Sequence, residues 1–329
     1  MKYLLRHLGL YLLTVWVAVT INFILPRAMP GDPVTALFAR MRGRLNPREI
    51  EAVRAAFGFS DEPLLTQYFQ YLGHVAQGDF GLSISAYPAK VTAVIATALK
   101  WTVLLGVVSL LISFTIGTIL GVIVSWRRGS HLDSVLTAFF SFTSSFPPFF
   151  LAMVALFFLS FILQWFPMAH SYSVNTISPE WSWAFVRSVL YHLILPAGTI
   201  ILVSISLWLI TMRSTMVSVL AEDYVTMAEA KGLPQRAVMF RYAMRNAVLP
   251  SFTQFGMAFG FILAGQILTE LVFSYPGLGF YLVRSVTTQD YPLMQALFLM
   301  ITLAVLGANL IVDLLYIRLD PRVRTNQTN

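Results

Sequence analysis

The polar residues that could act on a ligand lie mainly in the C-terminal half of the chain. Gln254, Gln266 and Glu270 interrupt an apolar stretch, and Gln266 and Glu270 are four residues apart. On a helix this spacing puts both side chains on one face, which could line an aqueous cavity. Hydrogen bonding between helices is the alternative for Gln266 and Glu270. The same alternatives apply to three other polar residues in apolar stretches: Asn22, Asn309 and Asp313.

A polar stretch further upstream could contact another protein. Residues 222–231 read as a short helix that ends at Gly232 and Pro234, and a basic helix is predicted over 235–248, ending before Leu249 and Pro250. A basic amphipathic helix often lies on an anionic membrane surface. Two short helices separated by a Gly-Pro break also suggest a lever that contacts a partner.

The residues that enzymes use most often are absent or poorly spaced. The chain has no Cys, and its five His are not at metal-ligand spacing. It also lacks the G-x-x-x-x-G-K-[ST], G-x-S-x-G and H-E-x-x-H motifs. We therefore expect no catalytic, cofactor-binding or metal-binding residue, and any ATP must be hydrolysed by another chain. Because ionisable residues avoid the centres of the apolar segments, an ion-coupled carrier is also disfavoured.

The composition indicates an integral membrane protein. Of 329 residues, 57% are hydrophobic and 11% are charged, whereas soluble proteins have about 45–50% and about 25%. The 22 Lys and Arg residues are scattered, which argues against nucleic-acid binding. A helix needs about 20 apolar residues to cross the bilayer. Six segments meet or approach this length: 8–25, 101–125, 134–163, 189–211, 252–273 and 293–315.

Positive charges predict that both termini are cytoplasmic. With that orientation, twelve of the 22 basic residues fall in cytoplasmic segments, and the two short outer loops hold only Arg187 and Arg284. The other eight lie in the outer segment 27–100. The excess of Lys and Arg on the cytoplasmic side holds for short loops, and this segment is too long for it to apply. The first apolar segment is read as a retained anchor, because it is longer than a signal-peptide core and no small-residue cleavage site follows.

Glycine and proline predict how the membrane helices bend and pack. Pro147 and Pro148 should kink the third segment, and Pro196 should bend the fourth; each is either an ordinary bend or a moving gate. Two small-residue motifs, Gly117-x-x-x-Gly121 and Gly256-x-x-x-Gly260, favour close helix packing.

The outer segment 27–100 is predicted to contain two helices. One begins at Asn46-Pro47-Arg48-Glu49 and ends near Gly58, and the other covers 64–75. This small helical subdomain either covers the membrane bundle or forms a docking surface or lid.

Several ordered motifs resemble the permease subunits of binding-protein-dependent ABC importers. The sequence DYVTMAEAKG at 223–232, with RNAVLP at 245–250, is similar to the EAA loop of that family. Other matching pieces are MPGDP (29–33), GDFGLS (78–83), ELVFSYPGLG (270–279), DLLY (313–316) and DPRVR (320–324). The "B"-type subunits of the dipeptide, oligopeptide and nickel permeases are the most similar branch. Two features depart from the EAA pattern. The Glu that gives the loop its name is absent, because its first three positions are Thr226-Met227-Ala228. The distance from Gly232 to Pro250 is also longer than in most EAA loops.

The resemblance implies an all-α integral membrane protein with six transmembrane helices, like a type I ABC importer. Its parts would be helix 1 (1–26), the extracytoplasmic helical subdomain (27–100), the permease domain (101–317) with a coupling loop (213–250), and a cytoplasmic tail (318–329). The ATPase-coupling helix would use Glu222, Asp223, Tyr224, Ala228, Glu229, Lys231 and Gly232. The Tyr275–Gly279 turn, with Pro276, Gly277 and Gly279, would shape the outer mouth or gate.

The resemblance also implies partners and a location. The partners would be a second homologous permease subunit, in a heterodimer rather than a homodimer, two ATP-binding-cassette ATPases and an extracytoplasmic solute-binding protein. The location would be the bacterial inner membrane. The substrate would be a di- or oligopeptide, with oligosaccharides or nickel chelates as alternatives. A membrane scaffold or receptor that does not transport remains the alternative from another class.

Overall fold

The computed structural model describes residues 2–28, 62–260, 262 and 266–319. The predicted helix near residues 46–58, the MPGDP motif and the DPRVR motif lie outside these residues. The chain forms two compact units: residues 1–102, 263–267 and 276–329 make unit 1, and residues 103–262 and 268–275 make unit 2. The predicted boundary after residue 100 falls inside a continuous helix, α5 (Val91–Trp126).

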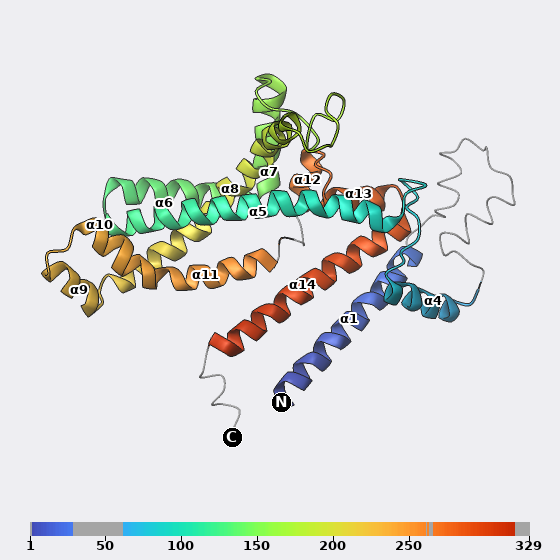
Figure 1. Cartoon of the computed structure of the whole chain (residues 1–329), viewed down its shortest axis with the longest axis horizontal. Coiled ribbons are helices and arrows are strands. Elements are labelled where there is room, and N and C mark those ends of the chain that lie inside the picture. Colours follow the sequence, from blue (N-terminus) through green and yellow to red (C-terminus); the bar gives the residue numbers. More distant parts are fainter. Residues whose placement is uncertain (1, 29–61, 261, 263–265, 320–329) are drawn as a thin grey trace. The chain divides into compact units, whose positions relative to one another are not determined.

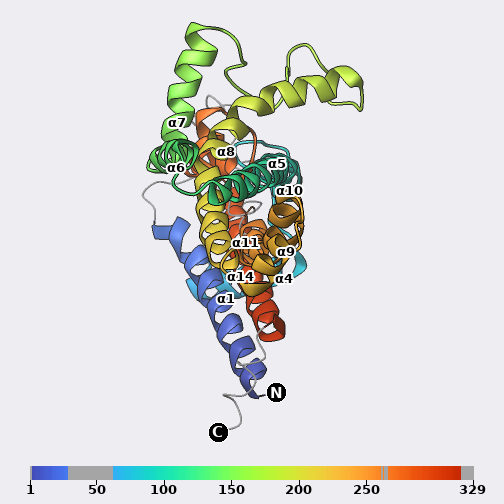
Figure 2. The same cartoon turned by 90° about the vertical axis from the view of Figure 1, so that its left-hand side faces the viewer.

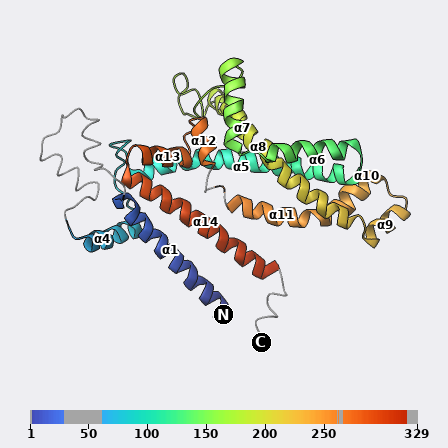
Figure 3. The same cartoon turned by 180° about the vertical axis from the view of Figure 1, so that it is seen from behind.

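Unit 1 is built on two antiparallel helices, α1 (Lys2–Ala28) and α14 (Tyr291–Leu319). They run side by side, so that α1 begins and α14 ends at the same end of the unit (Figure 1, Figure 3). The Nε2 of Gln295 donates to the carbonyl oxygen of Asn22 at 3.0 Å. The first and last helices of the chain are thus directly linked within unit 1.

Helix α4 (Leu64–Gln77) matches the helix predicted at 64–75, and it contacts the end of α1. The hydroxyls of Tyr68 and Thr20 are 2.7 Å apart, and the Tyr68 ring meets the Phe23 ring edge-on. The Arg27 guanidinium lies 3.7 Å from the Phe23 ring centroid and donates to Gln67 Oε1 at 3.0 Å. These contacts attach α4 to the membrane helix through aromatic and polar groups together.

A buried carboxylate joins the loop after α4 to the turn before α14. Asp290 is fully buried, and its Oδ2 accepts hydrogen bonds from Ser83 Oγ at 2.5 Å and from Ser85 Oγ and N at 2.8 Å. Its Oδ1 accepts from the backbone N of Leu293 at 3.3 Å, so the same residue caps α14. Beside it, α13 (Leu278–Thr287) packs against α14 and the first part of α5.

Unit 2 is built around the second part of α5 and the long helix α8 (Trp183–Val219), with α6 (His131–Ser144) and α7 (Pro148–Ala155) against α8. After α8 come several shorter helices. They are α9 (Asp223–Ala230), α10 (Gln235–Ala237), the π-helical segment η2 (Val238–Ala243), α11 (Met244–Gly260) and α12 (Ile267–Val272).

Glycines bring α5 and α8 into contact. A Cβ added at Gly117 would lie 2.6 Å from Trp208 Cβ, and one at Gly121 would lie 2.6 Å from Met212 Cβ. The predicted packing role of Gly117-x-x-x-Gly121 is therefore confirmed. At Gly256 an added Cβ would meet none of the described residues within 4 Å, so this glycine of the second motif shows no close helix contact within the described part of the chain.

The kink predicted at Pro147 and Pro148 is a full break between helices. α6 ends at Ser144, and α7 starts at Pro148 and continues into the π-helical segment η1 (Leu156–Ile162). The two arms are bent by 93° (Figure 1, Figure 2). Two consecutive residues without a backbone N–H explain the break. A single proline is tolerated, because α8 passes through Pro196 without interruption.

Two expectations for the following segment were wrong. The basic helix was predicted to end before Leu249, but α11 continues through Pro250 to Gly260. The Thr215 hydroxyl donates to the carbonyl of Ala247 at 2.9 Å, which supports the backbone near the proline. The predicted apolar segment 252–273 is not one helix, because α11 ends at Gly260 and α12 begins at Ile267.

Among the described residues, three helices are long and apolar enough to cross a membrane: Val91–Trp126, Trp183–Val219 and Tyr291–Leu310. The bent pair His131–Ser144 and Pro148–Ile162 makes a fourth if it counts as one span, and Gly9–Leu25 is a shorter apolar helix. At 1.5 Å per residue, α5 and α8 are each about 54 Å long, well above the hydrocarbon thickness of about 30 Å. Their ends therefore extend into the aqueous or interfacial regions.

Candidate functional site

Helix α9 attaches to unit 2 through a narrow apolar stripe. Val225 and Ala228 are 1% and 3% exposed, whereas the other residues of α9 are exposed, with Met227 at 60%. The stripe packs into a cluster of buried residues from α5, α8, η2 and α11: Val122, Met212, Met216, Val238, Ala243 and Ala247. Most of the circumference of α9 is thus exposed, while its buried stripe fixes its position relative to four other helices.

Both ends of α9 are defined by local sequence. Glu222 is extended, and Asp223 puts a negative charge in the first turn, where the helix dipole favours it. At the other end Gly232 has φ +71, a left-handed conformation that suits glycine. Its N–H bonds to the carbonyl of Glu229 at 2.8 Å, and the Leu233 N–H bonds to that of Ala228 at 3.4 Å, which is a Schellman motif. The predicted stop at Gly232 is confirmed.

These contacts divide the seven residues predicted for the coupling helix into exposed and buried ones. Six are exposed and form what we call the coupling surface, together with Met227: Glu222, Asp223, Tyr224, Glu229, Lys231 and Gly232. The seventh, Ala228, faces the buried cluster instead. Its small side chain allows α9 to lie close to the cluster, so it supports the surface from behind.

A polar contact adds to this attachment. Asn246 Nδ2 on α11 donates to the Tyr224 hydroxyl on α9 at 2.8 Å. Thr215 on α8 bonds to the carbonyl of Ala247, the next residue of α11. Movement of α9 would therefore be transmitted directly to α11 and through it to α8.

An ion pair links α8 to the turn between α5 and α6. Arg213 Nε and Nη2 donate to Asp133 Oδ1 and Oδ2 at 2.7 and 2.8 Å, which is a bidentate arrangement. Asp133 is 4% exposed, and its Oδ2 also accepts from the backbone N of Gly129 at 3.0 Å. Ser130 caps α6 by accepting from the backbone N of Asp133 at 3.3 Å.

The three residues predicted to line a pathway lie in different surroundings. Gln254 is half-buried on α11, where its Oε1 accepts from the Thr211 hydroxyl of α8 at 3.3 Å. Gln266 is exposed and precedes α12, so it does not share a helical face with Glu270. Glu270 lies within α12 and is fully buried. Gln254 therefore takes part in a hydrogen bond between α8 and α11.

The turn predicted to shape the outer mouth, Tyr275–Gly279, is non-helical only up to Gly277, because Leu278 and Gly279 already belong to α13. Gly277 and Gly279 are buried, and Pro276 is half-buried. The backbone N of Leu278 donates to Thr102 Oγ1 on α5 at 2.7 Å, which fixes the start of α13. Of the other polar residues, Asn22 is 7% exposed on α1, and Asn309 is half-buried on α14, which also contains Asp313.

Comparisons with known proteins identify the family. The model of the family described as "Binding-protein-dependent transport system inner membrane component" matches residues 114–325. The chain belongs to this family. Among its relatives is the di/tripeptide transport system permease protein DppB of Pseudomonas aeruginosa (strain UCBPP-PA14), 34% identical over 98% of this chain and 99% of the relative. The resemblance drawn from the motifs is thereby confirmed.

Two further relatives of this inner membrane component cover most of its length. The oligopeptide transport system permease protein AppB of Bacillus subtilis (strain 168) is 34% identical over 92% of this chain and 93% of the relative. The glutathione transport system permease protein GsiC of Salmonella typhi is 34% identical over 98% and 99%. All three relatives are named as permease proteins of transport systems.

The sequence reading missed the groups that hold this inner membrane component together at the α5–α6 turn. Arg213 was counted only as a topological charge, and Asp133 was not selected. A signal was present, since Ser130-x-x-Asp133 is a capping pattern before a helix. The link between Asp290 and Ser83 was missed as well, and its partners are 207 residues apart, beyond the range of local patterns. In the described part of the chain, no group of three or more His, Asp or Glu is placed to hold a metal ion.

Proposed function

We propose that this chain is the permease subunit of an ABC importer and forms half of the translocation pathway for short peptides. Family membership and the three relatives named as peptide, oligopeptide and glutathione permeases support this proposal. The observation that carries it is the coupling surface: an exposed helix on a buried apolar stripe that contacts α5, α8 and α11. A helix that another protein moves needs an exposed surface for that protein and a packed attachment to the membrane helices, and α9 has both.

The assembly proposed here has four other subunits or partners. Two ATPases bind the coupling surface, a second and non-identical permease completes the pathway, and an extracytoplasmic binding protein delivers substrate. The chain crosses the bacterial inner membrane six times with both termini in the cytoplasm. In this topology α1 and α14 are the first and last spans, α6 with α7 forms a broken third span, and α11 with α12 forms a broken fifth span.

Transport follows from the way the coupling surface is attached. When the ATPases close on ATP, α9 moves with them, and the cluster around Met212 and Met216 carries the movement to α8 and α5. The hydrogen bond from Asn246 to Tyr224 carries it to α11. The central pathway then opens alternately to either side, provided that the two permease conformations differ in affinity for the closed ATPases.

The proposed cargo class is the di- or tripeptide, because the relatives that cover nearly the whole chain include di/tripeptide and glutathione permeases. Oligosaccharides and nickel chelates are the other cargoes considered from the sequence. Uptake of trialanine, a maltooligosaccharide and a nickel–histidine chelate by the complete importer separates these classes. Uptake of trialanine alone is expected, and uptake of only one of the other two compounds would contradict the peptide class.

The coupling role is tested by two charge substitutions that should leave helix α9 folded. Met227→Asp and Glu229→Lys change exposed side chains and leave the buried stripe intact. In affinity purification of the tagged chain from its native membrane, each variant should retain less ATPase than the wild type. ATP-driven uptake should fall in parallel.

A matched control is Leu65→Asp, which puts a charge at an apolar side chain 71% exposed on α4. This variant should retain the ATPases as the wild type does. If both α9 variants retain full ATPase binding and full uptake, α9 is not the contact. If the wild-type chain brings down no P-loop ATPase at all, the scaffold or receptor alternative is favoured instead.

A further inference from the structure

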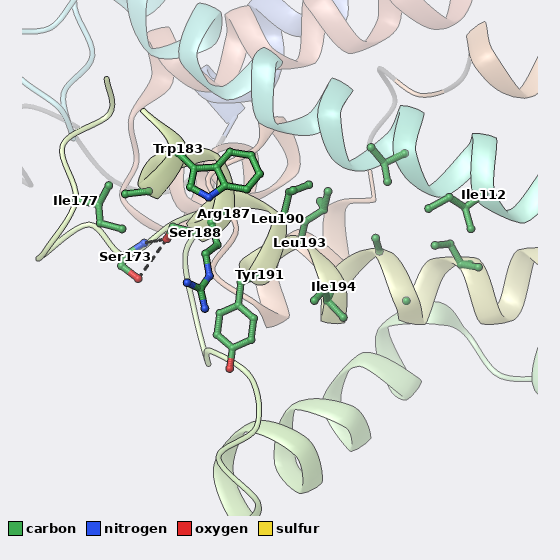
Figure 4. Close-up of a pocket in the computed structure, with 15 residues that line it drawn as sticks. Ile112, Ser173, Ile177, Trp183, Arg187, Ser188, Leu190, Tyr191, Leu193 and Ile194 are labelled. Atoms are coloured by element: carbon green, nitrogen blue, oxygen red, sulfur yellow. Dashed lines mark hydrogen bonds between the residues drawn. The ribbon is translucent and has the colours of Figure 1, made fainter. Parts of the chain in front are cut away.

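A large pocket lies along the N-terminal half of α8 in unit 2 (Figure 4). Its volume is about 1200 Å³, and its walls come from α8, from Val108 and Ile112 on α5, and from the segment around Ser173 and Ile177. The walls are mainly apolar, and Ala197 and Gly198 leave space along α8. Ligand pockets usually measure about 300–1,000 Å³, so this one can hold a short peptide.

One cation faces this pocket. Arg187 lies on α8 one helical turn before Tyr191, and both extend from the same side of the helix in Figure 4. Within the described part of unit 2, the Arg187 side chain makes no hydrogen bond or ion pair. Arg187 is exposed, so its guanidinium is open to a ligand, and its planar set of N–H donors matches a carboxylate.

The hydroxyl groups of Ser173, Ser188 and Tyr191, which also line the pocket, are already engaged. The Ser188 hydroxyl accepts from the backbone N of Ser173 at 3.0 Å and donates to its hydroxyl oxygen at 3.3 Å. The Tyr191 hydroxyl donates to the carbonyl oxygen of Trp165. These bonds hold the segments around the pocket in place, and they leave Arg187 as the group that can bind a charged ligand.

We propose that Arg187 binds the terminal carboxylate of a short peptide during its passage through the importer, with the peptide side chains against the apolar walls. This inference rests on the proposed function and extends it to a contact within this chain. A carboxylate matches the planar, bidentate geometry of a guanidinium. It is also the one negatively charged group that free peptides of any sequence share at the same end.

The design of the pocket suits passage rather than storage. A transport site must bind well enough to admit its ligand and weakly enough to release it. The single charged contact allows the ligand to bind. The mostly apolar walls accept different side chains without specific hydrogen bonds, so the ligand can also be released. In the proposed topology the N-terminal half of α8 follows the outer loop, so the pocket is on the side where the binding protein delivers substrate.

The test uses the complete importer in nanodiscs without its binding protein, so that selection by the binding protein does not enter. Saturation-transfer NMR then compares two probes, trialanine and trialanine amide, which differ only at the carboxylate. We expect Arg187→Gln to weaken trialanine binding by about tenfold, toward the value for the amide, because a charge-assisted hydrogen bond is lost. Amide binding should be unchanged, and Arg187→Lys should restore part of the difference.

The control is Arg284→Gln, which removes an exposed cation of α13 that does not line the pocket. It should leave both probes unaffected. Equal binding of trialanine and its amide by the wild type, or equal loss of both in Arg187→Gln, would overturn the proposal. Two other results for Arg187→Gln with unchanged trialanine binding would also overturn it. One is the loss of a bound anionic lipid, measured by mass spectrometry, and the other is separation of the two permeases on a sizing column. In each of these cases ATP-driven peptide uptake by the wild type would still support the proposed function.

Discussion

Arg213 on α8 and Asp133 on α6 form two parallel hydrogen bonds of 2.7 and 2.8 Å across the turn that follows α5. Asp133 is buried, and the pair joins α8, the long helix that precedes α9, to the first turn of α6. Because the coupling surface is attached to this same end of α8, the ion pair determines whether a displacement of α9 moves α6 as well.

Arg213→Ala should strongly destabilise unit 2. The substitution leaves the buried Asp133 carboxylate without its cation, which costs about 3 kcal/mol in comparable buried pairs. The free energy of unfolding in mixed detergent micelles measures this loss. The double variant Arg213→Ala with Asp133→Ala should recover part of it, since no unpaired charge then remains. Equal stability of Arg213→Ala and the wild type would show that the pair contributes nothing.

Gly232→Ala should reduce coupling more than it reduces folding. Gly232 has φ +71, and a side chain in this conformation costs about 1 kcal/mol, so the end of α9 and the adjoining part of the coupling surface should shift. The ratio of peptide imported to ATP hydrolysed should fall. Gly73→Ala is the control, because that glycine is helical and an added Cβ meets nothing within 4 Å. An unchanged ratio in Gly232→Ala would contradict this role.

Gly121→Ala should force α5 away from α8. The added Cβ would lie 2.6 Å from Met212 Cβ and 2.8 Å from the carbonyl oxygen of Leu209, and the backbone must move to accommodate it. We expect a loss of about 2 kcal/mol in unfolding free energy, as in overpacked cores. Gly256→Ala makes the same chemical change on α11 in open space and should be neutral or slightly stabilising. Similar effects of the two substitutions would contradict the structure.

Asp290→Ala should release the loop that follows α4. It removes the acceptor of the Ser83 and Ser85 hydroxyls and the cap of α14, and buried donors left without acceptors cost about 1–3 kcal/mol each. Limited proteolysis near residues 80–90 should become faster. Asp79→Asn changes an exposed carboxylate in the same loop and should leave the cleavage rate as it is. Unchanged cleavage in Asp290→Ala would show that the serines are held by other contacts.

The sequence predicts those features that depend on neighbouring residues. The stop of α9 at Gly232 needs only a left-handed residue after a helix, and the break at Pro147 needs only two missing N–H groups. Gly117 and Gly121 also mark a real contact, although the same spacing at Gly256 marks none. A small-residue motif shows where a helix can approach closely, but not whether a partner lies there.

The features that the sequence does not predict depend on distant contacts. α11 continues through Pro250 because its surroundings, including Thr215 on α8, support the backbone there. The partners of Asp133 and Asp290 lie 80 and 207 residues away, so no local pattern relates them. The pocket at Arg187 forms from three separate segments, and in the sequence Arg187 is only one of two cations in the two short loops predicted on the outer side.

ATP-driven uptake of radiolabelled trialanine into sealed proteoliposomes tests the dependence of this chain on partner ATPases most directly. We predict accumulation only when this chain is reconstituted with its second permease, both ATPases, the binding protein and ATP, and none when Met227→Asp replaces the wild-type chain. Accumulation by this chain alone, without any ATPase in the vesicle, would contradict the proposed function.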